Sequence, residues 1–454
     1  MLCTVPLFAS SEILYTIEYV MSRFYDGDLS IEFQKRNDIL FMLPNGASFQ
    51  LSVSFFCQCD GSWLNKDLLP SSVSEFDVSD ILPGSACLPV LFGKPHLTQE
   101  RKSIYCDIDI FGTIFFLLSR YEEAVQDSQL DDHGRFLAIN SVAYKYDFLD
   151  RPIVDEYINL LRHLFFSLDS SIEIKVENVR SLVTCDVDWP FEPNRCSIKK
   201  TIRASIGDLL KRRQPISALN RWVGYLCFKL NLTYRDTARE RVSWIMDVNE
   251  EKGNKVAFYF ITECTDAYYD SNFDFDSPNI RALLSEIHER GHEIGLHPGY
   301  KCFDNPNLFK KSADSLKSTL SDMGIVQSEL GGRMHYLRWD AKTTPKLWDD
   351  NGFDYDSTLS FAELSGFRCG TCHPFPMYDL VNRKPLKVIQ RPLINMESTV
   401  IASKYEAKGY SDESVYRFNQ FKRTVEENRG EYVLLWHNTH FDNDKDEEIY
   451  KGLI

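Results

Sequence analysis

Strand-like and helix-like segments alternate along the chain from about residue 176 onward. Runs rich in β-branched and aromatic residues predict strands at 180–188, 255–262, 292–297 and 431–437. Amphipathic helical patterns separate them, such as "SPNIRALLSEIHERG", which ends at a glycine. Strands that alternate with helices predict parallel β–α–β units, either as a barrel or as an open sheet. We therefore expect an α/β fold in this part of the chain.

The first 175 residues follow a different pattern and suggest a separate domain. Strand-like pieces such as "SFQLSVSFF" are mixed there with helix-like ones such as "DIFGTIFFLLSRYEE". A chain of 454 residues is also too long for one small hydrophobic core. We expect an α+β domain of unknown role at 1–175, followed by a second domain at 176–454.

A basic stretch at about 198–242 interrupts the second domain of this otherwise acidic chain, whose formal net charge is −15. It lies between the first two predicted strands, so it reads as a long helical insertion. One interpretation is a solvated helical hairpin. The other is a cap that contacts an anionic substrate, or a membrane surface that carries a lipid-linked substrate.

Two aspartates, Asp186 and Asp188, stand at the end of the first predicted strand, in "SLVTCDVDWP". Residues two apart in a strand point to the same face, so the two carboxylates project together. Such a pair is costly unless it shares a cation or a proton. Alone, the pair fits a turn that closes a strand equally well.

Three further strand ends carry polar residues that suit catalysis or metal binding. His297 ends the strand of "GHEIGLH", Arg333 and His335 share one face of "GGRMHYLRW", and His437 ends "YVLLWH". β–α units place their functional groups at the carboxyl ends of the strands. The coincidence of four such ends predicts a site there.

In this order, these segments resemble the motifs of the polysaccharide deacetylase family (carbohydrate esterase family four, the chitooligosaccharide deacetylase homology domain). The resemblance covers about residues 180–445 and rests on "TCDVD", "GHEIGLH", Arg333 followed by "GFDYDST", and "LLWH". The first half resembles the extra domain of deacetylase-like proteins from bacterial surface-polysaccharide loci.

The resemblance implies a distorted (β/α) barrel of about seven strands with its site at the carboxyl-end face. It implies that Asp186 is the general base, that Arg333 orients it, and that His437 is the general acid. Asp188 and His297 would bind a divalent metal, with Zn²⁺ as the expected ion. The implied reaction removes an acetyl group from an N-acetylated or O-acetylated sugar or glycan in surface-polysaccharide metabolism.

One position departs from the family pattern. Lys301 stands where the family has a third metal-binding histidine, and a protonated lysine cannot bind a cation. We expect His335 to be the third ligand, with His440 and His373 as weaker candidates. The alternative is a non-catalytic glycan-binding or scaffold protein with a degraded metal site.

Charge and composition limit the partners and the location. The acidic balance argues against general nucleic-acid binding, and no apolar run reaches the ~20 residues of a membrane span. Without a recognisable secretion signal, the twelve cysteines read as reduced thiols, which predicts a cytoplasmic protein. We expect a carbohydrate substrate, free or linked to a lipid or nucleotide, and the oligomeric state stays open.

Overall fold

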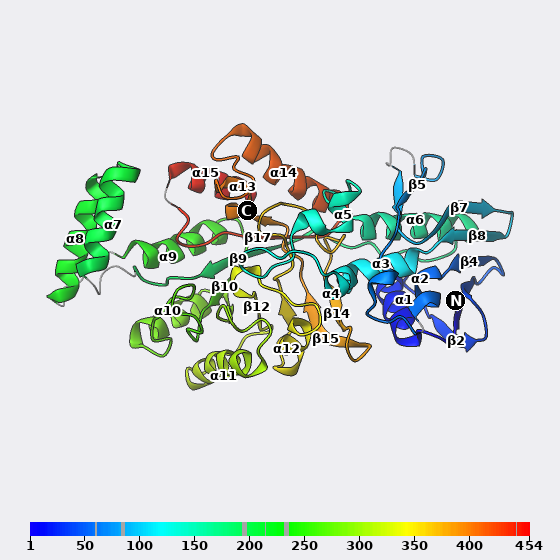
Figure 1. Ribbon diagram of the computed structural model, residues 1–454, viewed down its shortest axis with the longest axis horizontal. Helices are drawn as coiled ribbons and strands as arrows, with labels where there is room; N and C mark the ends of the chain where they lie inside the picture. Colours follow the sequence, from blue (N-terminus) through cyan, green and yellow to red (C-terminus); the bar gives the residue numbers. More distant parts are fainter. Residues whose placement is uncertain (60, 83–86, 193–197, 214, 231–235, 442) are drawn as a thin grey trace.

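The computed structural model describes residues 1–454 except 60, 83–86, 193–197, 214, 231–235 and 442. Two large sheets lie one after the other along the long axis of the molecule (Figure 1). The first is built from strands before residue 110, and the second from strands after residue 179.

The first sheet has six strands in the order β2-β1-β3-β4-β8-β7. Helices α1 (Ser10–Phe24), α3 (Ile110–Leu118) and α6 (Ile153–Leu168) supply its apolar core. Phe165 of α6, for example, lies with its ring centroid 5.1 Å from those of Phe41 and Phe49. The strands are β1 (Leu2–Pro6), β2 (Ser30–Gln34), β3 (Asp38–Met42), β4 (Ser48–Ser52), β7 (Gly93–Gln99) and β8 (Ser103–Ile108).

The second sheet has nine strands in the order β14-β15-β13-β12-β11-β10-β9-β17-β16. Every neighbouring pair is parallel except β14 with β15. The strands are β9 (Arg180–Val187), β10 (Val256–Phe260), β11 (Glu293–Leu296), β12 (Gly331–Gly332), β13 (Tyr355–Asp356), β14 (Phe375–Asp379), β15 (Lys384–Gln390), β16 (Asn395–Met396) and β17 (Glu431–Leu435).

Helices separate the parallel strands of this sheet along the chain. They are α9 (Thr237–Glu250), α10 (Pro278–Glu289), α11 (Pro306–Asp322), α12 (Thr344–Asp350) and α14 (Asp412–Glu427). All five residues of β10 and all five of β17 are buried, as expected for parallel strands that are covered on both faces. The expected α/β fold is confirmed.

The expectation of about seven strands differs from the observed sheet. It has nine strands, and among the described residues no pairing joins its edge strands β14 and β16. The sheet is therefore curled but open. Strands β12, β13 and β16 have only two residues each, too few to give a periodic signal in the sequence.

The basic stretch contains a helical hairpin. It consists of α7 (Ile198–Gly207), a π-helical turn at Asp208–Arg212, and α8 (Pro215–Lys229). Helix α9 starts within the expected insertion and packs on the body through ion pairs of Arg239 with Glu286 and of Arg241 with Glu447. Figure 1 shows α7 and α8 at one end of the molecule, beyond α9.

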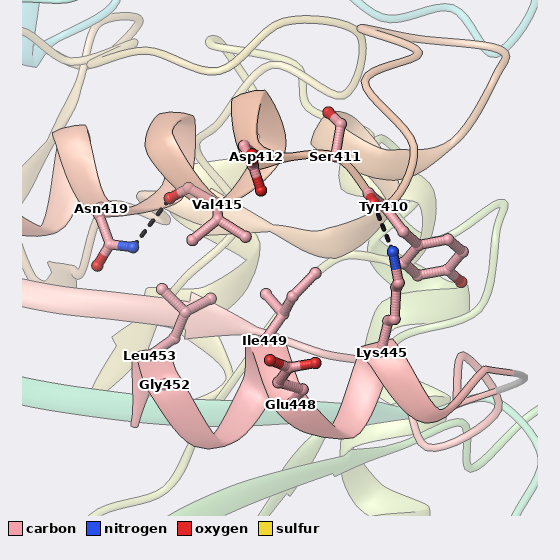
Figure 2. A pocket seen from close by; sticks show the side chains of 10 residues that line it. All are labelled: Tyr410, Ser411, Asp412, Val415, Asn419, Lys445, Glu448, Ile449, Gly452 and Leu453. Atoms are coloured by element: carbon pink, nitrogen blue, oxygen red, sulfur yellow. Dashed lines mark hydrogen bonds between the residues drawn. The ribbon is translucent and has the colours of Figure 1, made fainter.

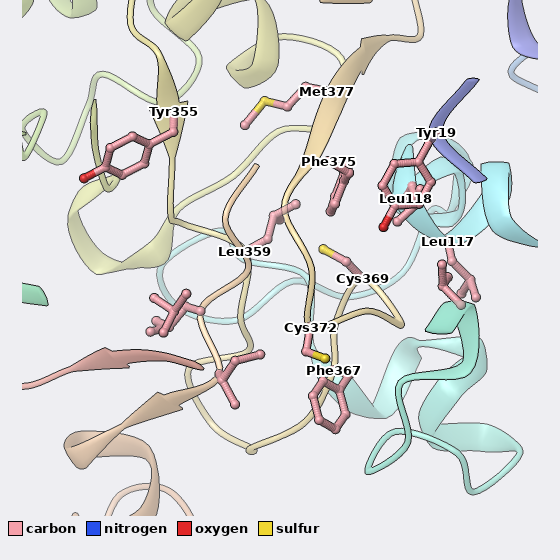
Figure 3. Packing of buried hydrophobic residues seen from close by; sticks show 14 of the residues in the cluster. Tyr19, Leu117, Leu118, Tyr355, Leu359, Phe367, Cys369, Cys372, Phe375 and Met377 are labelled. Atoms are coloured by element: carbon pink, nitrogen blue, oxygen red, sulfur yellow. The ribbon is translucent and has the colours of Figure 1, made fainter. Parts of the chain in front are cut away.

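Buried side chains connect the two halves of the chain. Figure 3 shows Tyr19 and Leu118 of the first half facing Phe375 across a shared core that includes Cys369 and Cys372. Polar groups are paired across the same boundary: Asp155 accepts a hydrogen bond from Thr371 and another from the backbone N–H of Cys372. The predicted division into two domains at residue 175 stays a prediction.

Among the described residues, no helix is long and apolar enough to cross a membrane.

Candidate active site

Four strand ends of the second sheet meet at one cavity of about 390 Å³. Asp186 lies in β9, and His297 and Arg333 directly follow β11 and β12. His437 lies two residues after β17. Parallel strands bring their carboxyl ends to the same edge of a sheet, so residues more than two hundred positions apart in the sequence share this cavity.

Arg333 holds Asp186 in a fixed orientation. Its Nη1 donates hydrogen bonds to Asp186 Oδ1 at 2.7 Å and to Thr184 Oγ1 at 2.9 Å. Its Nε and Nη2 donate to the carbonyl and the hydroxyl of Ser357, at 2.8 and 3.0 Å. The guanidinium is completely buried, so its charge is balanced mainly by the carboxylate of Asp186.

Asp188, His297 and His335 bring three ligand atoms together. His297 Nε2 lies 3.5 Å and His335 Nε2 lies 3.6 Å from Asp188 Oδ1. This oxygen is buried and has no hydrogen-bond partner among the described residues. A buried carboxylate oxygen without a partner is costly, and a cation between the three atoms would remove that cost.

The outer nitrogens of both histidines are already engaged. His297 Nδ1 lies 2.6 Å from the carbonyl oxygen of Arg333, and His335 Nδ1 lies 2.8 Å from Asp270 Oδ1. With Nδ1–H donated outward, each neutral ring turns the lone pair of Nε2 toward Asp188. One carboxylate and two imidazoles form a ligand set typical of catalytic divalent metals, so these residues fit such an ion.

The pKa values of Asp188 and His297 are shifted because charged groups lie close to both side chains. Burial raises the pKa of Asp188, but contact with His297 and the nearby charges of His335 and His437 outweigh it and hold this pKa well below its usual range. Burial lowers the pKa of His297, and the carboxylates of Asp186 and Asp188 reverse that effect and raise it. The site thus attracts positive charge.

His437 lines the same cavity and is held by a buried glutamate. Its Nδ1 lies 2.5 Å from Glu397 Oε1, which also lies 2.6 Å from His440 Nδ1. Burial alone would lower the pKa of His437, but the Glu397 carboxylate, together with those of Asp188 and Asp186, raises it to about 10. His437 is therefore protonated at neutral pH and has a proton to give from Nε2.

A segment of the first half fixes the loop that carries His335. Tyr336 has a left-handed backbone, with φ at 62°, which is costly for a bulky residue. Arg135 Nη1 donates to the Tyr336 carbonyl at 2.8 Å, and the His133 ring lies 4.6 Å from the Tyr336 ring. Arg338 Nε in turn donates to the carbonyl of His133 at 2.7 Å. These contacts stabilise a conformation that the loop would not adopt by itself.

The remaining sequence candidates lie elsewhere. Lys301 is half exposed and pairs with Asp266 at 2.9 Å, so it does not take part in the ligand group. His373 belongs to a different group with Asp155 and Cys372, and its Nδ1 pairs with Glu177 at 3.1 Å. His440 lies beside His437 on Glu397 rather than beside Asp188.

Several residues of the site have no clear signal in the sequence. Asp270 orients His335, Glu397 holds His437, and Arg135 lines the cavity from the first half. They lie in loops or at a helix start, where no strand periodicity points to them. The acidic loop around Asp270 is a weak hint only, because acidic residues are common in solvated loops.

A separate pocket lies between α14 and α15 (Asp444–Leu453). Figure 2 shows Val415, Ile449 and Leu453 in its wall, with Lys445 donating to the carbonyl of Tyr410 at one end. None of the three candidate metal groups among the described residues lies in it. The strand-end cavity is therefore the better candidate for chemistry.

Comparisons with known proteins add little about activity. A model of a family of unknown function, DUF7033, matches residues 2–169, less than half of the chain. No curated protein matches. Among solved structures, the chain is similar to a presumed polysaccharide deacetylase from Mycobacterium smegmatis, with 13% identity over 62% of this chain and 83% of that chain and a TM-score of 0.39. The α/β assignment follows from the strand order and the parallel pairing of the second sheet.

Proposed function

We propose that this protein is a metal-dependent hydrolase that removes an acetyl group from an N-acetylated or O-acetylated sugar or glycan. The observation that carries the proposal is the meeting of Asp188, His297 and His335 beside an aspartate that Arg333 holds in place. The resemblance of the strand-end motifs to polysaccharide deacetylases supports the choice of substrate.

Asp188 Oδ1, His297 Nε2 and His335 Nε2 would hold the divalent cation, with Zn²⁺ as the expected ion. A cation bound there would supply Lewis-acid chemistry, polarising the acyl carbonyl and making water more acidic.

Asp186 is the proposed general base. Arg333 occupies its Oδ1, and its Oδ2 lies 3.7 Å from His297 Nε2, next to the ligand group. Oδ2 takes the proton of the attacking water while the water oxygen bonds to the acyl carbon. Arg333 prevents this carboxylate from turning away, because it holds Oδ1 by a hydrogen bond.

His437 is the proposed general acid. As the bond between the acyl carbon and the sugar nitrogen or oxygen breaks, Nε2 gives its proton to the departing atom. Glu397 stabilises the charged ring before that transfer. The products are acetate and the free amine or alcohol, and Asp186 returns its proton to His437 through solvent.

The two predicted domains fit this proposal. The second, at 176–454, is the barrel-like domain that holds the strand ends, and the first, at 1–175, supplies the loop with Arg135. By resemblance to proteins of bacterial surface-polysaccharide loci, we place the reaction in surface-polysaccharide metabolism inside the cytoplasm, with a free, lipid-linked or nucleotide-linked sugar as substrate.

The proposal is tested by metal content and acetate release together. After supplementation with Zn²⁺, the purified protein should contain about one equivalent and release acetate from N-acetylated oligosaccharides. Asp188→Ala should lose both the metal and the activity, whereas Asp186→Ala should keep the metal and lose the activity. His163→Ala, at an exposed histidine of α6, is the control and should change neither.

The second candidate function is a non-catalytic glycan-binding or scaffold protein. Lys301 favours it, because the family's third metal-binding histidine is missing there. Less than about a tenth of an equivalent of metal after supplementation, with glycan binding but without acetate release, would support it over the hydrolase.

A further inference from the structure

The hairpin of α7 and α8 differs in charge from the rest of the molecule. Residues 198–230 contain eight Lys or Arg and one Asp, a net charge of +7, so the rest of the chain carries −22. No residue of this hairpin lines the strand-end cavity among the described residues. The structure therefore does not support the interpretation of the hairpin as a cap over an anionic substrate in this cavity. We expect a binding partner on the outer surface of the hairpin instead.

Among the described residues of the two helices, the buried side chains are small or polar rather than large and apolar. Thr201, Ser205 and Asp208 are buried on α7 and the adjoining turn, and Ala218 is buried on α8. Asp208 also pairs with Arg221 of α8 at 2.5 Å. Small residues four apart let two helices approach closely, as in hairpins that pack within lipid.

Large aliphatic side chains cover the outside of the hairpin instead. Their exposed fractions run from 39% to 77%, and along α8 they recur every three or four residues, which forms one continuous apolar stripe. They are Ile198, Ile202, Ile206, Leu209, Leu210, Ile216, Leu219, Val223, Leu226 and Leu230. Many large apolar side chains exposed together mark an interaction site.

We propose that this hairpin docks on the surface of an anionic lipid bilayer. The aliphatic side chains would lie among the acyl chains just below the headgroups, and the Lys and Arg side chains would contact the lipid phosphates. The helices would lie in the plane of the membrane, since neither is long and apolar enough to cross it. This proposal is independent of the proposed hydrolase function.

Charge favours a bilayer over a second copy of the chain. Two hairpins that paired through their apolar stripes would bring together two segments that each carry a net charge of +7, and like charges oppose association. An anionic bilayer neutralises the same charge and takes up the same apolar surface. The acidic body, which an anionic membrane repels, lies to one side of the hairpin (Figure 1).

The test is binding of the full-length protein to vesicles in a flotation assay. Vesicles of phosphatidylcholine with about 30% phosphatidylglycerol should bind the protein, and pure phosphatidylcholine should bind it at least about tenfold more weakly. Added salt should release the bound protein, because the basic side chains act through screened charge.

Two variants separate the apolar and the charged contributions. Leu210→Ser with Leu219→Ser should weaken binding to the anionic vesicles about tenfold or more. Lys199→Gln with Arg203→Gln should also weaken it about tenfold, but should leave binding to neutral vesicles unchanged. All four residues are exposed, so both variants should fold. Leu7→Ser with Val326→Ser, at exposed residues outside the hairpin, is the matched control and should bind like the wild type.

Three results would overturn the proposal. The first is absence of wild-type binding to the anionic vesicles, and the second is equal loss of binding in the control variant. The third is a wild-type dimer in sedimentation without lipid that Leu210→Ser with Leu219→Ser converts to a monomer, because the stripe would then be covered by a second copy.

Discussion

Asp186 and Asp188 are one residue apart, yet their partners give them different roles. Arg333 donates to Asp186 at 2.7 Å, whereas Asp188 Oδ1 faces two histidine Nε2 atoms and accepts no hydrogen bond among the described residues. Arg333 fixes the orientation of Asp186, as a general base requires, whereas a carboxylate oxygen without a partner suits a cation.

His335 should be essential for metal binding, and Lys301 should be dispensable. His335→Ala removes one of three ligands and should raise the Kd for Zn²⁺ at least about a hundredfold. Lys301→Ala should leave it unchanged, because Lys301 pairs with Asp266. Isothermal titration with a competing chelator measures both. Equal affinity in His335→Ala and wild type would show that the third ligand is another residue.

The ion pair of His437 and Glu397 should make stability depend on pH. Glu397 is the main carboxylate that raises the pKa of His437 to about 10, above the ~6.5 of an unfolded chain. Its stabilising contribution is therefore complete below about pH 6.5 and is lost as the pH rises toward about 10. In Glu397→Gln this contribution is absent, so the variant should be most destabilised near pH 6 and approach the wild type near pH 10.

Urea unfolding of both proteins between about pH 6 and pH 10 measures this difference. Glu413→Gln, at an exposed glutamate of α14, is the control and should show a small difference at every pH. A deficit in Glu397→Gln that stays constant over this range would contradict the pairing.

The site could be predicted from the sequence where a strand precedes the functional residue. Asp186, Asp188, His297, Arg333 and His437 follow strands or end them, and parallel topology brings strand ends together. Asp270 and Glu397 act from a loop and a helix start, so only the tertiary structure places them. Lys301 shows in the sequence that the usual third histidine is missing, and the structure places His335 beside Asp188.

At the scale of elements, the loop of His335 depends on a segment that is distant in the sequence. Arg135 donates to the Tyr336 carbonyl and thereby holds a left-handed backbone beside the ligand. No local pattern in "GGRMHYLRW" predicts this conformation, because its cause lies two hundred residues earlier.

Arg135→Ala should weaken metal binding without unfolding the protein. Without the hydrogen bond from Arg135 to the Tyr336 carbonyl, the loop can relax and move His335 Nε2 away from Asp188. The Kd for Zn²⁺ should therefore rise about tenfold to a hundredfold. Arg383→Ala is the matched control, because Arg383 also joins the two halves, through Glu12 at 2.8 Å, but lies outside the cavity. The same Kd for Zn²⁺ in Arg135→Ala and Arg383→Ala would show that Arg135 does not hold the His335 loop in place for metal binding.

The fold was predictable where elements are long. Strands β9, β10 and β17 and helices α10 and α11 lie where hydrophobic periodicity indicates them. The two-residue strands β12, β13 and β16 give no period, and β14 adds an antiparallel edge. The sequence therefore predicted an α/β fold but not the open, nine-stranded sheet.

At the scale of the whole molecule, buried charges join the two halves. Arg368 makes two hydrogen bonds to Glu123, at 2.9 and 2.7 Å, and Arg120 donates to the same carboxylate at 2.8 Å. All three side chains are almost completely buried. Removing one partner of such a group leaves an uncompensated charge.

Arg368→Met should therefore destabilise the entire chain rather than one half. We expect a loss of about 3 kcal/mol in the free energy of unfolding, still in a single transition. Calorimetry and urea unfolding measure it, with the exposed Arg423→Met as control. Two separated transitions in the wild type, or no loss in Arg368→Met, would show that the halves are not coupled in this way.

The position of the bound metal shows directly whether Asp188, His297 and His335 form a metal site. In crystals grown with Zn²⁺, anomalous diffraction at the zinc edge should give one strong peak at about 2.0–2.2 Å from Asp188 Oδ1, His297 Nε2 and His335 Nε2. No peak at that place, or a peak only at Glu397, His437 and His440, would contradict the account.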